Sequence, residues 1–158
     1  KTRSVPDDKE ACVSTADTLS PREVLERKLR LALAGNREEE VELFAPDAVV
    51  EFPFAPDGVP DRFEGREQIL AMSLALDKAR RQADFRVLKD KSRLTVHETL
   101  DPEVVIAELD AHVEVVATGD VRRVQQIHVY RVRDGRIVHL RDYFAGDGAD
   151  MVRKALAA

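Results

Sequence analysis

His128 and Asp142 are two residues whose types and spacing suit acid/base chemistry. Both lie in segments that alternate between apolar and polar residues, a pattern typical of β-strands. Gln126 and Tyr130 share the alternation of His128, so these polar side chains are expected on one face of a sheet. An imidazole and a carboxylate within hydrogen-bonding distance can take up and return a proton near neutral pH. Polar residues on an otherwise apolar face therefore indicate a candidate catalytic pocket.

The elements expected to position this pair are three helices followed by a run of strands. Ser20 as N-cap, Pro21 after it and Glu23 at the capping-box position predict the start of the first helix. Its end is expected at Gly35-Asn36, further helices at 37–44 and 66–81, and strands at 48–54, 94–99, 103–117, 121–132 and 136–144. This order predicts an α+β fold with the helices packed on one face of an antiparallel sheet.

The expected register of two hairpins brings the pair together. A two-residue turn at Gly119-Asp120 would place Ala111 opposite His128 on the neighbouring strand. A three-residue loop at Arg133–Gly135 would then put His128 diagonal to Asp142, with Cα atoms about 7–8 Å apart. The two side chains are therefore expected to meet directly or through one water.

The face that carries this pair is expected to point inward. Beside Gln126 and Tyr130, its predicted substrate-binding lining is apolar and consists of Val50, Phe52, Phe54, Leu109, Val113 and Leu140. Such a lining would raise the pKa of Asp142, whereas a protonated His128 would lower it, and the sequence leaves that balance open. The opposite face is rich in charge and carries Ile127, Val129 and Ile137, so it is expected to be solvated or to form a wet subunit contact.

A purely structural interpretation of the polar residues stays open. A buried histidine is more often a satisfied core residue than a catalyst. Asp142 alone could cap the end of the sheet or bind a backbone amide, and Tyr130 could be a core residue whose hydroxyl is satisfied at the rim.

Several segments in this order resemble the SnoaL-like branch of the NTF2-like (ketosteroid isomerase-like) superfamily. They are VELFAPDAVVEFPF, FEGREQIL and IHVYRVRDGRIVHLRDYF. HETLDP, AELDAHV and RDYF also resemble segments of the PhzA and PhzB proteins of phenazine biosynthesis. The resemblance implies a conical α+β barrel, three helices in a curved antiparallel sheet, with a pocket inside the cone and a homodimer. SnoaL-like polyketide cyclases are similar in having a histidine and an aspartate where this chain has His128 and Asp142.

Two catalytic patterns from the same superfamily do not carry over. Ketosteroid isomerases have an aspartate base at the position where this chain has Phe52. Their second oxyanion-hole acid corresponds to His128 here. The arginine and second aspartate of limonene-epoxide hydrolases fall at Leu109 and Ala111. Steroid isomerisation is therefore disfavoured.

The composition is that of one water-soluble domain, with 158 residues of which 44% are hydrophobic and 35% charged. Thirty acids against 25 bases give a net charge of −5, so nucleic acid is not an expected partner. The longest apolar stretch, 69–76, is far shorter than the ~18–20 residues of a membrane span. Residues 1–19 are expected to be a flexible tail before a single domain at 20–158. The lone Cys12 and the absence of a signal-like start predict a cytoplasmic protein.

Together these features predict a cofactor-free enzyme of small-molecule, secondary metabolism that binds no metal. Asp142 would remove a proton next to the carbonyl of a small apolar substrate, and His128, assisted by Gln126 or Tyr130, would donate to the enolate oxygen. Cyclisation or isomerisation is the leading expectation. Epoxide opening, and a non-catalytic ligand-binding or assembly domain, are the alternatives.

Overall fold

The computed structural model describes residues 18–157, and the expectations for the first 17 residues, Cys12 included, lie outside that range. The helices are α1 (Pro21–Ala34), α2 (Arg37–Val41), α3 (Gly65–Gln82) and α4 (Asp147–Leu156), with a 3-10 turn, η1 (Lys89–Lys91). The strands are β1 (Phe44–Glu51), β2 (Arg62–Glu64), β3 (Phe85–Val87), β4 (Arg93–Glu98), β5 (Val104–Val115), β6 (Val121–Arg133) and β7 (Arg136–Phe144). Within the described part of the chain, no helix combines the length and apolar character that a membrane crossing requires.

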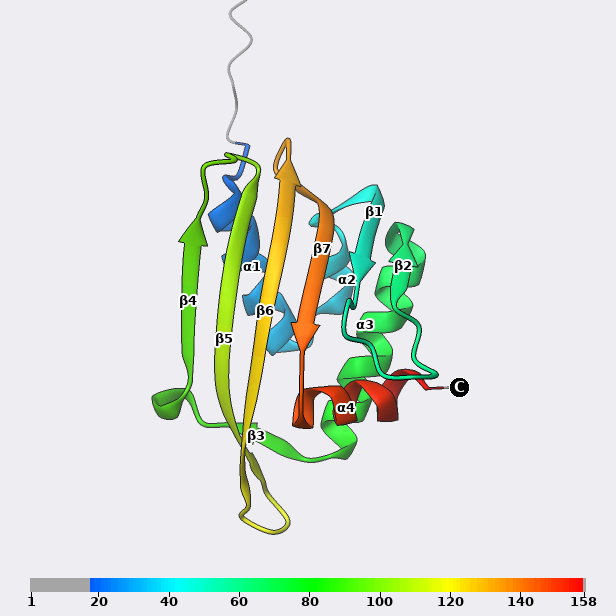
Figure 1. Cartoon of the computed structure of the whole chain (residues 1–158), viewed down its shortest axis with the longest axis vertical. Coiled ribbons are helices and arrows are strands. Elements are labelled where there is room, and N and C mark those ends of the chain that lie inside the picture. Colours follow the sequence, from blue (N-terminus) through cyan, green and yellow to red (C-terminus); the bar gives the residue numbers. More distant parts are fainter. Residues whose placement is uncertain (1–17, 158) are drawn as a thin grey trace, which may run out of the picture.

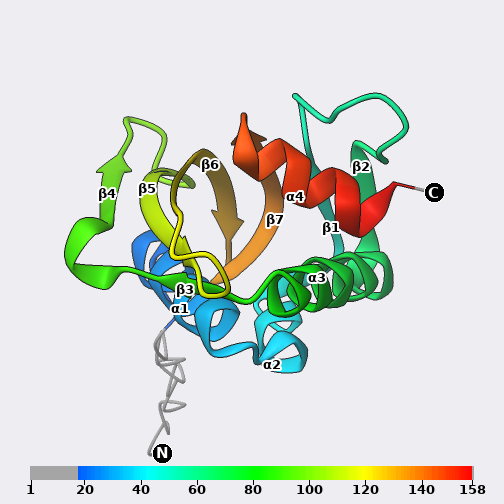
Figure 2. The same ribbon diagram turned by 90° about the horizontal axis from the view of Figure 1, so that it is seen from below.

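One curved, unclosed sheet of seven strands holds the fold together, and helices α1, α2 and α3 lie on its concave side (Figures 1 and 2). The strand order is β2-β1-β7-β6-β5-β3, and β4 also pairs with β5. The predicted α+β fold is confirmed. The sheet differs from the prediction in one pair, because β1 runs parallel to β7 while the other pairs are antiparallel. A parallel pair requires a long connection, and here most of the domain separates the two strands.

Helix α1 begins where the sequence predicts. The Ser20 side chain accepts a hydrogen bond from the Glu23 backbone at 3.3 Å, and the Glu23 carboxylate accepts one from the Ser20 amide at 2.8 Å. Gly35 ends the helix in the left-handed conformation, with φ of 72°. The helix turns Val24 and Leu25 into the core, where both are fully buried.

The hairpin of β5 and β6 has a longer loop than predicted. Gly119 donates to the Val115 carbonyl at 2.8 Å, and the loop extends from there to Asp120. His128 consequently pairs with Ala107, four residues from the predicted partner, Ala111. An even shift leaves every side chain on its predicted face, because side chains alternate with a period of two.

The hairpin of β6 and β7 also differs in register. Asp134 and Gly135 form a two-residue turn with φ of 50° and 71°, the positive values of a tight hairpin turn. The register changes again next to Val132, and this bulge turns Ile137, predicted on the outer face, fully into the core. As a result, His128 stands directly opposite Asp142 rather than diagonal to it.

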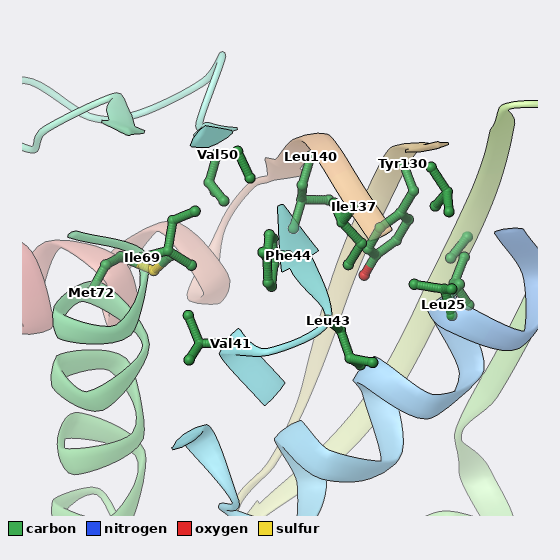
Figure 3. Close-up of a cluster of buried hydrophobic side chains, with 14 of the residues drawn as sticks. Leu25, Val41, Leu43, Phe44, Val50, Ile69, Met72, Tyr130, Ile137 and Leu140 are labelled. Carbon is green, nitrogen blue, oxygen red and sulfur yellow. The ribbon is translucent and has the colours of Figure 1, made fainter. Parts of the chain in front are cut away.

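The core lies between the concave face of the sheet and the helices. Figure 3 shows side chains from β1, β6, β7 and the three helices that meet there, with the Tyr130 ring beside Ile137. Phe52 packs edge-on against Phe63 and Phe144, with ring centroids 5.4 and 5.2 Å apart. Leu19, which precedes the first helix, packs against the same cluster.

The cap of α1 allows a direct test of what holds this helix in place. Replacing Ser20 by alanine should lower the free energy of unfolding by about 1 kcal/mol, since it removes the acceptor for the Glu23 amide. Asn36→Ala is the matched control, because Asn36 is the N-cap of α2 and makes no side-chain cap bond. Urea denaturation of both variants measures the difference. Equal losses would contradict the role of the Ser20 cap.

Candidate active site

The structure brings His128 and Asp142 together on the concave face. Nε2 of His128 lies 3.2 Å from Oδ1 of Asp142. The contact is bent, and neither atom makes a well-aligned hydrogen bond with any described residue. The His128 side chain is 6% exposed and that of Asp142 17%. Since Oδ1 is shielded from water, the exposure of Asp142 lies on its other atoms. One carboxylate oxygen is therefore held in the core while the remainder faces the solvent side.

Tyr130 holds the other nitrogen of the imidazole. Its hydroxyl lies 3.1 Å from Nδ1 of His128, and its side chain is fully buried. Burial raises the pKa of Tyr130 to about 12, although the nearby Lys28 works in the opposite direction. The phenol is therefore protonated at neutral pH and has a proton to donate.

Lys28 of α1 joins this group from the helix layer, and nothing in the sequence analysis predicted it. Its ammonium lies 3.2 Å from Oε1 of Glu40 in α2. Burial by itself would lower the pKa of Lys28, but Tyr130, Glu40 and Asp142 outweigh burial and raise it. Lys28 is therefore a largely buried cation at neutral pH, with 13% of its side chain exposed.

Glu40 belongs in turn to a buried cluster of charges between the three helices. Arg37 contacts both acids of the cluster, Glu40 and Asp77, the second at 3.2 Å. Arg80 donates to Asp77 at 2.7 Å, and Arg81 donates to it as well. Burial alone would raise the pKa of Asp77, but the hydrogen bonds from Arg81 and Arg37 outweigh it and lower the pKa. Asp77 is therefore ionised at neutral pH.

The other residues predicted to line the site fall into three groups. Val50, Phe52, Val113 and Leu140 are buried on the concave side, as predicted. Leu109 and Gln126 face each other across β5 and β6 and are partly exposed. Phe54 is placed wrongly by the prediction, because it is 64% exposed and packs edge-on against Tyr143 of β7, with centroids 5.3 Å apart. The strand ends before Phe54, so the alternation that suggested an inward side chain does not extend to it.

Helical spacing could have indicated two residues that the sequence analysis missed, Lys28 and Asp77. Lys28 follows Val24 and Leu25 by four and three positions, so it lies on the buried face of α1. Asp77 lies on the buried face of α3 in the same way, eight positions after Ile69. A charged residue at such a position marks a buried ion pair, although its partner on another helix cannot be read from spacing. Among residues 18–157, no group of three His, Cys, Asp or Glu side chains is arranged to hold a metal ion.

The curved sheet around three helices, with a histidine and an aspartate paired on its concave face, defines an NTF2-like protein. A sequence profile of the SnoaL-like domain matches residues 25–140. The chain belongs to the SnoaL-like family of the NTF2-like superfamily, in a branch with PhzA/B-like relatives.

Three known proteins are similar to this chain in sequence or in fold. An uncharacterised PhzA/B-like protein of Pseudomonas aeruginosa is 33% identical over 126 residues, which are 80% of this chain and 84% of that protein. The crystal structure of a candidate isomerase from Bacillus subtilis is 31% identical, with a TM-score of 0.65, over 87% of this chain and 95% of that one. A candidate polyketide cyclase from Pseudomonas putida has a TM-score of 0.60 at 13% identity, over 88% and 99% of the two chains, and shows the same fold.

The buried cluster gives a stability prediction. Asp77→Asn should lower the free energy of unfolding by roughly 3–5 kcal/mol at pH 7, because it leaves buried arginine charge without its partner. The pKa of Asp77 is lowered in the folded state, so this stabilisation is present above pH about 4 and is lost as pH falls through the lowered pKa. Urea denaturation between pH 3 and 7 measures the difference between the two proteins.

Glu98→Gln is the control for Asp77→Asn, because Glu98 is an exposed acid of β4 with no ion pair among the described side chains. It should change stability little at any pH. The interpretation that an ionised Asp77 stabilises the fold would be contradicted if Asp77→Asn lost no more free energy of unfolding than this control. It would also be contradicted if the loss grew as the pH falls.

Proposed function

We propose that the protein is a cytoplasmic, cofactor-free enzyme that cyclises or isomerises a small, largely apolar carbonyl compound. The observation that carries the proposal is the environment of Asp142. One of its oxygens is shielded against His128 while the side chain remains 17% exposed. A carboxylate in that position can accept a proton from a substrate on its exposed side.

In this proposal His128 has a different part from the one that the sequence suggested. Nδ1 lies 3.1 Å from the Tyr130 hydroxyl, Nε2 lies 3.2 Å from Oδ1 of Asp142 without a well-aligned hydrogen bond, and the side chain is almost fully buried. His128 therefore orients the carboxylate. Gln126 is the better donor to the developing enolate oxygen, because its half-buried amide makes no hydrogen bond within the described residues.

The proposed step moves one proton and leaves the atoms balanced. Asp142 takes a proton from the carbon next to the carbonyl, and the electron pair of that bond becomes the enolate, which Gln126 stabilises. The enolate then attacks an electrophilic carbon within the same molecule, which closes a ring, or takes the proton back at another carbon, which isomerises it. Membership of the SnoaL-like family and the likeness to a candidate isomerase support this reaction class.

Exchange of a carbon-bound proton tests the base without the natural substrate. In D₂O the protein should catalyse deuterium exchange at the α-carbon of members of a panel of cyclic and aryl ketones, followed by proton NMR. Asp142→Asn and His128→Ala should each slow this exchange by roughly 10²–10⁴-fold. Because the two residues act together, the double variant should lose far less than the product of the two factors.

Asp90→Asn, which changes an exposed carboxylate in η1, is the matched control and should exchange like the unmodified protein. The stability of Asp142→Asn should fall little, since a buried charge maintained for function is often a burden on folding. Exchange that survives in Asp142→Asn would rule out the proposed base. In that case a ligand-binding role would be the better explanation of the site.

We further propose that the protein is a homodimer formed through the convex face of the sheet. No described helix covers that face, which is turned toward the viewer in Figure 1. It has a groove of about 520 Å³ whose lining includes Phe54, Tyr143 and Ile127. Arg123 and Asp110 pair beside it at 2.7 Å. A self-complementary surface with an apolar centre and paired charges around it suits a two-fold contact.

Ile127→Glu should convert the dimer into a monomer, because Ile127 is 44% exposed at the centre of this face and a buried unpaired carboxylate would oppose association. Sedimentation velocity at micromolar concentration measures the mass. Leu100→Glu, a fully exposed leucine in the loop between β4 and β5, is the control and should leave the mass unchanged. A monomeric unmodified protein would contradict the proposal.

A further inference from the structure

The concave face of the sheet is packed on one side of the candidate site and partly open on the other. Tyr130 and His128 on β6 are buried, as is Ala107, which pairs with His128 from β5. The next residues on the same face, Gln126 of β6 and Leu109 of β5, are both partly exposed. Within residues 18–157, solvent therefore reaches this face on the Gln126 side of His128.

The other directions around Asp142 are closed. Its neighbours on the same face of β7, Leu140 and Phe144, are 4% and 2% exposed. Phe52, which follows the adjacent strand β1, is buried and packs edge-on against Phe144. Helix α4, which Figure 2 shows crossing from the end of β7 toward α3, also covers Phe144, since a Cβ atom added at Gly148 would lie 3.5 Å from the Phe144 Cβ atom. The exposed part of Asp142 therefore faces toward β6 and β5.

One line of side chains leads in that direction to the edge of the sheet. Gln126 pairs with Leu109 of β5, and Leu109 pairs with Leu94 of β4. Residues that pair directly across antiparallel strands share a face, so all three lie on the concave side. Because neighbouring strands are about 4.8 Å apart, Leu94 lies about 10 Å from Gln126 along this line. The Leu94 side chain is 45% exposed.

We propose that Leu94 determines substrate specificity, as the far end of a subsite for the apolar body of the substrate. The substrate carbonyl lies at Gln126, its apolar body crosses Leu109, and its end contacts Leu94. The subsite selects carbonyl compounds whose apolar part extends about 10 Å from the carbonyl carbon. This role deepens the proposed function and rests on it for the placement of the carbonyl at Gln126.

The place of Leu94 in the fold distinguishes it from other exposed leucines. A single exposed leucine is ordinary on a protein surface, and Leu100 in the next loop is fully exposed. Leu94 differs because it stands in line with Gln126 and the open side of Asp142. A substrate that covers Leu109 and Leu94 removes apolar surface of both partners from water, whereas a shorter one covers Leu109 alone.

Two ketones of different length test the subsite through binding alone. Acetophenone has one ring beside its carbonyl and 2-acetylnaphthalene has two, so only the second ketone reaches Leu94. NMR titration should show that the unmodified protein binds 2-acetylnaphthalene about tenfold more tightly. Leu94→Gln should weaken binding of 2-acetylnaphthalene by about 5–10-fold and leave that of acetophenone within about twofold. Leu109→Ala should weaken binding of both ketones, because both cross Leu109.

Leu100→Gln is the matched control, because it makes the same change in the loop between β4 and β5, and it should alter neither dissociation constant. Urea denaturation checks that Leu94→Gln folds, and Leu94→Ala takes its place if it does not. Equal affinity of the unmodified protein for the two ketones, or binding of neither, would overturn the proposal. So would a change at Leu94 that weakens both ketones equally or weakens neither.

Binding is measured without turnover, so this proposal and the proposed function fail separately. If Leu94→Gln discriminates between the ketones as expected while deuterium exchange survives in Asp142→Asn, the proposed base is wrong and the subsite stands. If exchange is lost in Asp142→Asn but Leu94→Gln treats the two ketones alike, the base is supported and the subsite is wrong.

Discussion

The rest of the structure depends on the pairing of charges that the three helices bury between them. Glu40 and Asp77 are 2% and 1% exposed, and a carboxylate at that depth without a partner would cost several kcal/mol. Arg37 contacts both acids, and Lys28, Arg80 and Arg81 reach them from the flanking helices. Apolar contacts tolerate a helix that slides or rotates, whereas these contacts require one placement. The cluster therefore fixes the placement of α1, the helix that carries Lys28.

The same cluster couples the helix layer to the candidate site. Lys28 pairs with Glu40 at 3.2 Å, and its positive charge lowers the pKa of the Tyr130 phenol against the larger effect of burial. The candidate site thus combines His128 and Tyr130 of β6 with Asp142 of β7, while the charge of Lys28 on α1 acts on Tyr130 and Asp142. The burial of His128 and Tyr130 limits the movement of both side chains, and such precise placement is what the proposed acid/base chemistry would require.

Much of the fold and the central pair of the site follow from the sequence. The capping residues predict the start of α1, and the alternation of apolar and polar residues along two strands predicts that His128 and Asp142 lie on the same face. Both predicted hairpin registers are wrong around His128, by four residues on β5 and by two on β7. The face assignments survive there because both errors are even. Where a bulge changes the count by one, as between Ile137 and His139 on β7, the prediction of the face fails.

The parts that could not be predicted depend on contacts between distant segments. Helical spacing places Lys28 and Asp77 on buried helix faces, but nothing local predicts that Arg37 will contact both Asp77 and Glu40, the partner of Lys28. The alternating pattern of the preceding strand extends to Phe54 in the sequence. In the structure, however, β1 ends three residues earlier, and Phe54 packs against Tyr143 on the other side of the sheet. Local rules describe an element well. They do not describe where an element stops when its end is decided by tertiary contacts.

The parallel pairing of β1 with β7 has a consequence for how the chain reaches this state. Val50 pairs with Leu140, and nearly the whole domain lies between them in sequence. During synthesis on a ribosome, β1 emerges early and keeps one unpaired edge until β7 follows, so the nascent chain carries an exposed strand edge for most of its elongation. Contacts of such long sequence separation also slow folding. The final strand thus carries Asp142, the proposed proton acceptor, and its pairing with β1 also completes the sheet.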